Sequence, residues 1–296
     1  MKLNNQDFDD LVDGNLVTRR TDERGFSTYK YKNKVFYKNL WHKHPLLLEA
    51  RGVVFDADGE VVNRPFKKAF NIGENGTKID PDRFYCAVRK INGFMAAASI
   101  HNGELVVSTT GTTTSEYAKL ARNYVEPYKE HISMTHTMIF EVCDPSDPHI
   151  VEEEAGLYLL GIRSKHTGEL TSQNIVRKWA RQDFGKDIEY EILSGYNILN
   201  KVRDVKHEGF ALYDIATHEM VAKIKSPHYL SKKAMMRMGG SGANWMFDNP
   251  ASFRMKRLDE EFYDVQQYIL DNYSKEDWLG AKEQDRRKVI EEYFYA

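Results

Sequence analysis

The chain contains little cysteine and no long apolar run. Cys86 and Cys143 are its two cysteines in 296 residues, and both lie in apolar, strand-like segments. Two thiols without metal-ligand spacing exclude a disulfide framework and a zinc knuckle, so we expect buried free thiols in a reducing cytoplasm, that of the host if the chain is viral. No stretch approaches the roughly 18 apolar residues of a membrane span. The first residues lack the apolar core of a signal peptide.

The chain also lacks an excess of positive charge. Its formal net charge is −2, whereas a protein that grips long nucleic acids by counterion release is usually basic overall. Positive charge is concentrated locally, because residues 201–240 carry eight Lys/Arg against four Asp/Glu. Such a segment is either a phosphate-facing surface or a solvated face, and charge alone favours the solvated face.

Strand and hairpin patterns dominate the middle of the chain, and helical periodicity fills the gaps. A strand is expected over residues 85–100, followed by the Asn102-Gly103 turn and a return strand. Residues 209–213 are expected to pair with residues 220–225. Residues 173–184 have helical spacing, with Ile175, Val176 and Trp179 on one face. Mostly antiparallel strands with scattered helices predict an α+β fold.

The C-terminal end has a different pattern. Gly239–Gly242 punctuates the chain, and the residues after it have helical periodicity. Helices are expected over residues 258–273 and over residues 274–293, the second opened by a Ser274 cap. We therefore predict two domains, residues 1–235 and a small all-helical domain over residues 243–296.

Candidate chemical groups recur in order along the chain. Attack on the α-phosphate of a nucleoside triphosphate requires a nucleophile, cations that spread the phosphate charge, a carboxylate for a metal and contacts to the nucleoside. Taken singly, each candidate is more often a surface charge or a strand-end residue. The ordered set favours a nucleotidyl-transfer site, and its members are Arg51, Lys90, Gly93, Glu141, Glu208, Lys223 and Lys225.

The candidate nucleophile is Lys90, because the neutral amine of a partly buried lysine is reactive. Gly93 would allow close approach of the nucleotide. Lys223 and Lys225 lie two apart on one expected strand, so their side chains share a face. They are expected to form a phosphate clamp and to depress the pKa of Lys90.

These residues lie in segments that resemble the motifs of covalent nucleotidyltransferases, the ligases and capping enzymes. Upstream elements are similar to RNA ligases of the phage tRNA-repair type and to the adenylyltransferase domain of fungal tRNA ligases. The segments are Ala50–Phe55, Arg64–Glu74, Lys90–Gly93, Phe140–Glu141, Leu157–Arg163, Glu208–Gly209 and Lys223–Lys225. The resemblance covers about residues 50–226. It implies an ATP-grasp-like nucleotidyltransferase domain of antiparallel sheets with flanking helices.

The resemblance also implies a reaction and roles. Lys90 would form lysyl-AMP from ATP with Mg2+, or with Mn2+ in its place, and AMP would then activate a 5′-phosphate for joining to a 3′-hydroxyl. The implied RNA includes cleaved tRNA. Separately, we expect the protein to be a monomer. Glu141 would contact the ribose, Glu208 the metal, and Lys223 and Lys225 the α-phosphate. Arg51, Lys68 and Phe70 would act near the nucleotide, and Tyr158 and Leu160 are the two candidates to pack on adenine.

The chain departs from the family pattern at two positions before its C-terminal part. Asn92 stands where the family usually has aspartate, and Ser108–Thr112 lacks a lysine that related phage enzymes carry nearby. The alternatives are a DNA ligase or a capping enzyme, which usually have an oligonucleotide-binding barrel after the last motif, and a non-catalytic nucleic-acid-binding module. The helical pattern of residues 230–296 argues against the barrel, and the intact Lys90, Glu208, Lys223 and Lys225 argue against the module.

Overall fold

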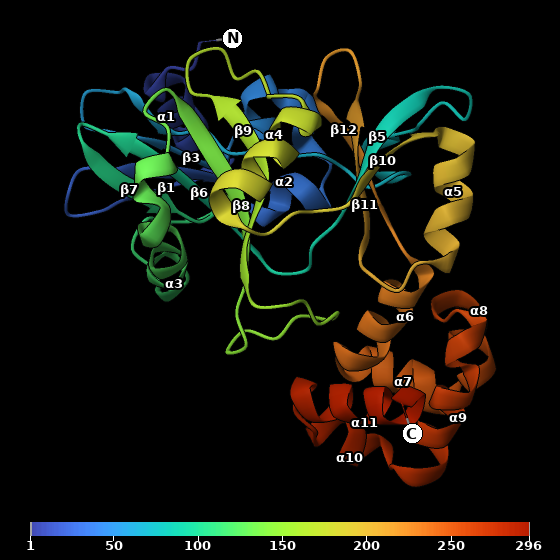
Figure 1. Cartoon of the computed structure of the whole chain (residues 1–296). Helices are drawn as coiled ribbons and strands as arrows, with labels where there is room; N and C mark the ends of the chain where they lie inside the picture. The colour runs from blue at the N-terminus through green and yellow to red at the C-terminus, as the bar shows by residue number, and fades with distance from the viewer. Residues whose placement is uncertain (1, 296) are drawn as a thin grey trace.

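Three four-stranded antiparallel sheets form the larger part of the molecule (Figure 1). The computed structural model describes residues 2–295. The first sheet has the order β1 (Val17–Thr21), β2 (Ser27–Tyr31), β3 (Arg51–Phe55), β4 (Val61–Asn63). The second has the order β10 (Tyr190–Ser194), β5 (Phe84–Arg89), β11 (Gly209–Asp214), β12 (Met220–Lys225). The third has the order β7 (Glu104–Ser108), β6 (Phe94–His101), β8 (His136–Cys143), β9 (Gly156–Ser164).

The second and third sheets are joined where the sequence predicts one continuous strand. β5 ends at Arg89 and β6 begins at Phe94, so the expected strand over residues 85–100 is wrong. The backbone N–H of Lys90 donates to Gly209 at the edge of β11, and Phe94 already pairs with Val142 on β8. Residues 90–93 therefore cross from one sheet to the other, which an apolar pattern alone does not reveal.

The core between these two sheets lies beneath the crossing. Its buried side chains come from both sheets and include Cys86, Val88, Ile91, Ile139, Tyr158, Ala211 and Tyr213. The opposite face of the second sheet is covered by α5 (Gly195–Asp204), through Ile198 and Val202. Both cysteines are buried free thiols, as expected.

Helices cover the outer faces of the sheets. For one of these helices, the sequence predicted the wrong buried face. α1 (Asn5–Asp13) and α2 (Asn33–Tyr37) contribute to the core of the first sheet, and α3 (Glu116–Val125) covers the third. In α4 (Gln173–Trp179), Val176 is buried whereas Ile175 and Trp179 are 46% and 38% exposed. A π-helical turn over residues 180–184 follows α4 and buries Ala180 and Phe184 in their place. The wider turn shifts the buried stripe away from 3.6-residue spacing.

Residues 226–295 contain helices and no strand. The helices are α6 (Pro227–Met236), α7 (Gly240–Asp248), α8 (Pro250–Arg257), α9 (Tyr263–Asn272), α10 (Lys275–Gly280) and α11 (Glu283–Tyr295). They lie together on one side of the sheets, with the C-terminus among them (Figure 1). The Ser274 hydroxyl caps α10 as expected, by accepting from the Asp277 N–H at 3.0 Å. A break at Ala281–Lys282 divides the predicted final helix in two.

The helical region has its own core, which bears on the predicted domain division. Tyr229, Met235 and Met236 of α6 belong to this core, together with Ile150 from the loop that follows β8. We propose that the helical unit begins at α6, upstream of the Gly239–Gly242 segment. No helix in the described part of the chain has the length and apolar character to cross a membrane.

Candidate nucleotidyl-transfer site

Lys90 lies at the crossing between the second and third sheets. Its ammonium donates to Glu208 Oε2 at 2.8 Å, and its side chain is 24% exposed. Glu208 immediately precedes β11, and its side chain is 3% exposed. Lys225, on β12, donates to the other carboxylate oxygen at 3.2 Å. The structure thus brings the predicted nucleophile, the predicted metal ligand and one lysine of the predicted clamp into direct contact.

The pKa of Lys90 is raised, and the sequence-based expectation that it would be depressed is wrong. Burial alone lowers the pKa of this ammonium, but the carboxylates of Glu208 and Glu141 outweigh burial. The lysine pair was expected to lower this pKa because both ammonium groups share one face of a strand. The three-dimensional arrangement instead places Lys225 against Glu208, and the charges of Lys90 and Lys225 together hold the pKa of that buried carboxyl below its usual range.

Lys223 is the lysine in this pocket whose pKa is lowered. Burial and the charges of four cations, Arg51, Lys68, Lys90 and Lys225, lower its pKa to about 7. Cations converge in a partly buried site at a cost, because each destabilises its neighbours. A bound polyanion would relieve this repulsion, so the cluster has the electrostatic character of a phosphate site.

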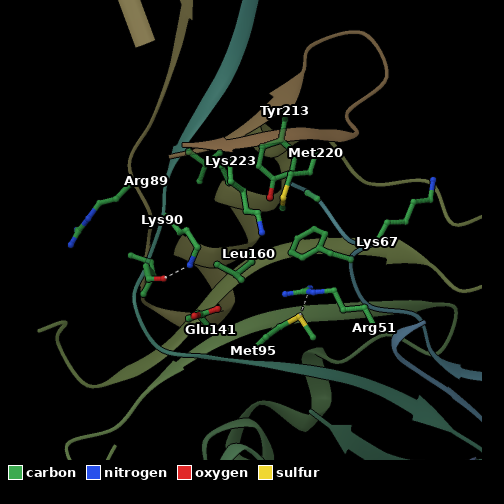
Figure 2. A pocket seen from close by; sticks show the side chains of 15 residues that line it. Arg51, Lys67, Arg89, Lys90, Met95, Glu141, Leu160, Tyr213, Met220 and Lys223 are labelled. Atoms are coloured by element: carbon green, nitrogen blue, oxygen red, sulfur yellow. Dashed lines mark hydrogen bonds between the residues drawn. The ribbon is translucent and has the colours of Figure 1, made fainter. Parts of the chain in front are cut away.

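A pocket opens beside these cations (Figure 2). Four predicted residues line it: Arg51, Lys90, Glu141 and Lys223. Leu160, one of the two adenine candidates, also lines the pocket. The other lining residues were not predicted as site residues, and they are Phe66, Lys67, Ala69, Val88, Arg89, Ile91, Met95, Ala211, Tyr213 and Met220.

Glu141 enters the pocket from the middle of β8. Its Oε1 accepts from the Gly93 backbone N–H at 3.1 Å, and its side chain is largely buried. Burial raises the pKa of Glu141 and outweighs the opposing effects of Lys90 and Arg51. On the facing strand, Arg51 directs one guanidinium nitrogen to Met95 Sδ at 3.3 Å. Carboxylate and guanidinium thus face the same cavity (Figure 2).

Lys68 and Phe70 lie beside the pocket but do not line it. The Lys68 ammonium lies 5.0 Å from the Phe70 ring centroid, and burial lowers the pKa of this lysine. The Phe70 ring is buried against Trp41, in the core of the first sheet. Its carbonyl accepts from the Lys223 backbone N–H at 2.9 Å. Phe70 therefore helps to position β12 through its backbone, and the neighbouring Lys67 lines the pocket instead of Lys68.

The pocket favours Leu160 over Tyr158 as the residue that would face a base. Leu160 lines the cavity, whereas the Tyr158 side chain belongs to the core between the sheets. The Tyr158 hydroxyl donates to the Glu154 carbonyl at 2.8 Å. Both residues share a face of β9, so sequence periodicity could not separate them.

The packing of neighbouring strands requires a glycine at position 93. The sequence-based expectation was instead that Gly93 allows close approach of the nucleotide. A Cβ built on Gly93 would overlap the Val142 carbonyl oxygen of β8 and come within 2.9 Å of Cys143 Sγ. The close approach is therefore to protein backbone. Gly209 has a similar constraint, with φ of +129° and a Cβ position that overlaps the Ile224 carbonyl oxygen of β12.

Gly93→Ala is expected to lower the free energy of unfolding by about 1–3 kcal/mol, because the methyl group overpacks the junction of β6 and β8. Chemical denaturation of wild type and variant measures the difference. Gly239→Ala is the control, since nothing lies within 4 Å of its Cβ position and its φ is −93°. Equal stability of Gly93→Ala and wild type would contradict the packing explanation.

Asn92 is a site residue that was noticed only as a departure from the family pattern. Its Nδ2 donates to Glu208 Oε2 at 2.7 Å, and its Oδ1 accepts from the Val151 N–H at 2.9 Å. The adjacent Ile150 packs into the core of the C-terminal helices. One buried amide therefore holds Glu208 and the loop that contacts those helices. The amide donates to one partner and accepts from the other, whereas an ionised aspartate could accept from Val151 but could not donate to Glu208.

Asn92→Ala should remove both hydrogen bonds and lower the free energy of unfolding by about 1–3 kcal/mol. Activity that depends on the orientation of Glu208 should fall about tenfold. Denaturation and label transfer from a nucleoside triphosphate measure the two effects. Asn197→Ala, at an exposed position on α5, should change neither. Wild-type values for Asn92→Ala in both assays would rule out this positioning role.

The chain is similar in sequence and in fold to known RNA ligases. A family model described as RNA ligase matches residues 49–247. RNA ligase 1 of bacteriophage TS2126 is 30% identical over an alignment of 169 residues, which covers 50% of this chain and 41% of that protein. The chain thus matches less than half the length of this curated relative.

Two solved structures of an archaeal ATP-dependent RNA ligase are similar in fold. Form 1 has a TM-score of 0.57 at 17% identity and covers 96% of this chain and 74% of its own. Form 2 has a TM-score of 0.55 at 16% identity, and the match covers 93% of this chain and 72% of the archaeal chain. The α+β nucleotidyltransferase fold expected from the sequence is therefore confirmed. Because the RNA ligase model spans well over half of the sequence, this chain belongs to the RNA ligase family.

Proposed function

We propose that this protein is an ATP-dependent RNA ligase that works through a covalent lysyl-AMP intermediate on Lys90. The observation that carries the proposal is the position of Lys90, which lines a pocket beside a convergent set of cations. Family membership supports the ligase class. The names of the matched phage protein and archaeal structures support RNA and ATP as substrates.

In the first step the Lys90 amine, having lost a proton, attacks the α-phosphorus of ATP. A nitrogen–phosphorus bond forms, the bond from the α-phosphorus to the bridging oxygen breaks, and pyrophosphate leaves. Lys223 and Lys225 neutralise charge that develops on the α-phosphate. Arg51 and Lys68 act on the neighbouring phosphates, Glu141 accepts from a ribose hydroxyl, and Leu160 packs on the adenine.

In the second step a 5′-phosphate oxygen of RNA attacks the phosphorus of lysyl-AMP, and the Lys90 nitrogen leaves. A diphosphate linkage between AMP and the RNA end results. In the third step an RNA 3′-hydroxyl attacks the 5′-phosphate phosphorus, AMP leaves, and a phosphodiester closes. The first displacement needs a neutral Lys90, so its contact with Glu208 must rearrange as the lysine charge is lost.

The residues of the site fit a divalent cation held partly by substrate. The described residues contain no group of three His, Cys, Asp or Glu side chains placed to hold a metal. Magnesium is often held by one or two carboxylates plus substrate phosphates. Glu208 would supply the carboxylate, and a bound Mg2+ or Mn2+ would neutralise phosphate charge. We propose Mg2+ as the usual cation.

The C-terminal helices favour RNA joining over the related activities. DNA ligases and capping enzymes usually carry an oligonucleotide-binding barrel after the last lysine motif. Here residues 226–295 contain helices and no strand. We propose RNA with 5′-phosphate and 3′-hydroxyl ends, cleaved tRNA included, as the substrate of a monomeric enzyme.

A ligation panel tests the proposal. The full chain is incubated with Mg2+ and either ATP or GTP, and with 5′-phosphorylated single-stranded RNA, tRNA halves, nicked duplex RNA or nicked DNA. Joining of RNA ends with ATP is expected, and joining with GTP is not. Exclusive sealing of nicked DNA, or transfer of GMP to an RNA 5′ end, would replace the proposal with one of the related activities.

A further inference from the structure

Apolar side chains and one tyrosine hydroxyl line the pocket together with its charged groups. The apolar residues include Phe66, Val88, Ile91 and Met220, and the tyrosine is Tyr213 from β11. Figure 2 shows the Tyr213 ring entering from β11 with its oxygen directed toward the middle of the pocket. The cations and Glu141 supply the other polar contacts of the cavity.

A strand irregularity arranges this apolar wall. β11 and β12 pair in regular register from Gly209 to Leu212, and the register then shifts so that Tyr213 pairs with Met220. Val221 is the extra residue, and it is 39% exposed. Bulges of this kind re-aim side chains beside functional sites. Here the bulge turns Met220, in place of Val221, into the pocket beside Tyr213.

No hydrogen bond joins the Tyr213 hydroxyl to a described residue, and its oxygen is directed into the pocket (Figure 2). Tyr213 as a whole is only 3% exposed, but its hydroxyl is not one of the buried polar atoms without a partner, so it is open to the pocket, where a molecule in the cavity can be its partner. Two other tyrosines near this sheet have one. Tyr85 accepts from the Asp80 N–H at 3.0 Å, and Tyr158 donates to Glu154. The partner of Tyr213 is therefore expected to come from a ligand.

A buried cation outside the pocket biases the direction of this hydroxyl. Arg177 of α4 is fully buried, and its positive charge acts on Tyr213. Arg177 donates to the Leu159 carbonyl, whereas its Nε and Nη1 have no partner among the described residues. Arg177 does not line the cavity. A hydroxyl dipole near a cation is most stable with its oxygen toward the charge, so Arg177 favours a hydroxyl hydrogen that points away from it.

We propose that Tyr213 is a base-specificity residue, whose hydroxyl donates to N1 of the bound adenine. This inference rests on the proposed use of ATP in the pocket. Adenine presents a ring nitrogen that accepts a hydrogen bond at N1. Guanine presents an N1–H donor there and an additional 2-amino group. Against a donor and apolar neighbours, guanine would leave buried donors unpaired, which penalises its binding.

The test compares nucleotides on wild type and Tyr213→Phe, with the rate of AMP transfer to the full chain as readout. Tyr213→Phe should lose about 10- to 100-fold in kcat/KM with ATP. Wild type should lose a similar factor with 1-deaza-ATP, in which a C–H replaces N1. The variant should lose nothing further with 1-deaza-ATP, because both changes remove the same bond. Its preference for ATP over GTP should narrow.

Tyr85→Phe is the matched control, since Tyr85 is a buried tyrosine on the adjacent strand β5 with a backbone partner. It should leave nucleotide preference unchanged, and thermal unfolding of both variants accounts for any loss of fold. If Tyr213→Phe loses a further factor with 1-deaza-ATP, so that the effects of the two changes multiply, the proposal is overturned. It is also overturned if Tyr213→Phe reacts with ATP at the wild-type rate. Wild type that is labelled by no nucleotide would overturn the proposed function as well, so the two failures differ.

Discussion

Lys90→Arg is expected to abolish transfer of AMP from ATP to the protein, with a loss of about 10³-fold or more. Arginine retains a positive charge opposite Glu208 but remains protonated, so it cannot attack phosphorus. The fold should survive, because the ion pair with the buried carboxylate is kept. Gel electrophoresis after incubation with α-labelled ATP and Mg2+ measures the transfer.

A pre-adenylylated RNA separates the roles of Lys90. This substrate enters at the third step, which does not use the lysine as nucleophile. Lys90→Arg should therefore still join pre-adenylylated RNA to a 3′-hydroxyl end, at a reduced rate. Labelling of Lys90→Arg by ATP at the wild-type rate would assign the nucleophile to another residue.

Glu208→Gln is expected to reduce AMP transfer by about 10²–10³-fold. The carboxylate is the counter-charge of both Lys90 and Lys225, and it accepts from the Asn92 amide. Glutamine keeps the shape but removes the charge, so two lysines would face each other without compensation. The same substitution removes the proposed metal ligand. Rates measured over a series of Mg2+ concentrations should show an increased requirement for the cation.

Asp214→Asn provides a control for Glu208→Gln. Asp214 lies at the other end of β11, has a side chain that is 5% exposed, and pairs with Arg83 rather than with the site. This variant should lose stability without a comparable loss of AMP transfer. If Glu208→Gln transfers AMP at the wild-type rate at every Mg2+ concentration, Glu208 has no role in metal binding or in positioning Lys90.

The sequence was sufficient to predict which charged residues meet. Lys90, Glu208 and Lys225 are up to 135 residues apart in the chain, yet their order along the chain and the family resemblance placed them in one site. The pairing of β11 with β12 followed from apolar runs around a turn, and the expected pairing is confirmed. Such predictions succeed because strand alternation decides which side chains share a face.

Other features depend on contacts that no local pattern contains. The raised pKa of Lys90 arises from Glu208 and Glu141, which are distant in sequence. The reason for Gly93 is the carbonyl of a neighbouring strand. Met220 enters the pocket because of a bulge, which apolar spacing does not reveal. The start of the helical unit was placed by glycine content, whereas the core of that unit already includes Tyr229.

The most direct test of this account is the location of AMP on the wild-type protein. The structure contains two candidate amines in one pocket, and the pKa of Lys223, about 7, makes it the more readily deprotonated one in the free protein. We nevertheless assign the nucleophile to Lys90, because it lies in the motif Lys90–Gly93 and forms an ion pair with Glu208. After incubation with ATP and Mg2+, peptide mapping by mass spectrometry under conditions that preserve the nitrogen–phosphorus bond should find AMP on Lys90. AMP on Lys223, with Lys90 unmodified, would contradict the account.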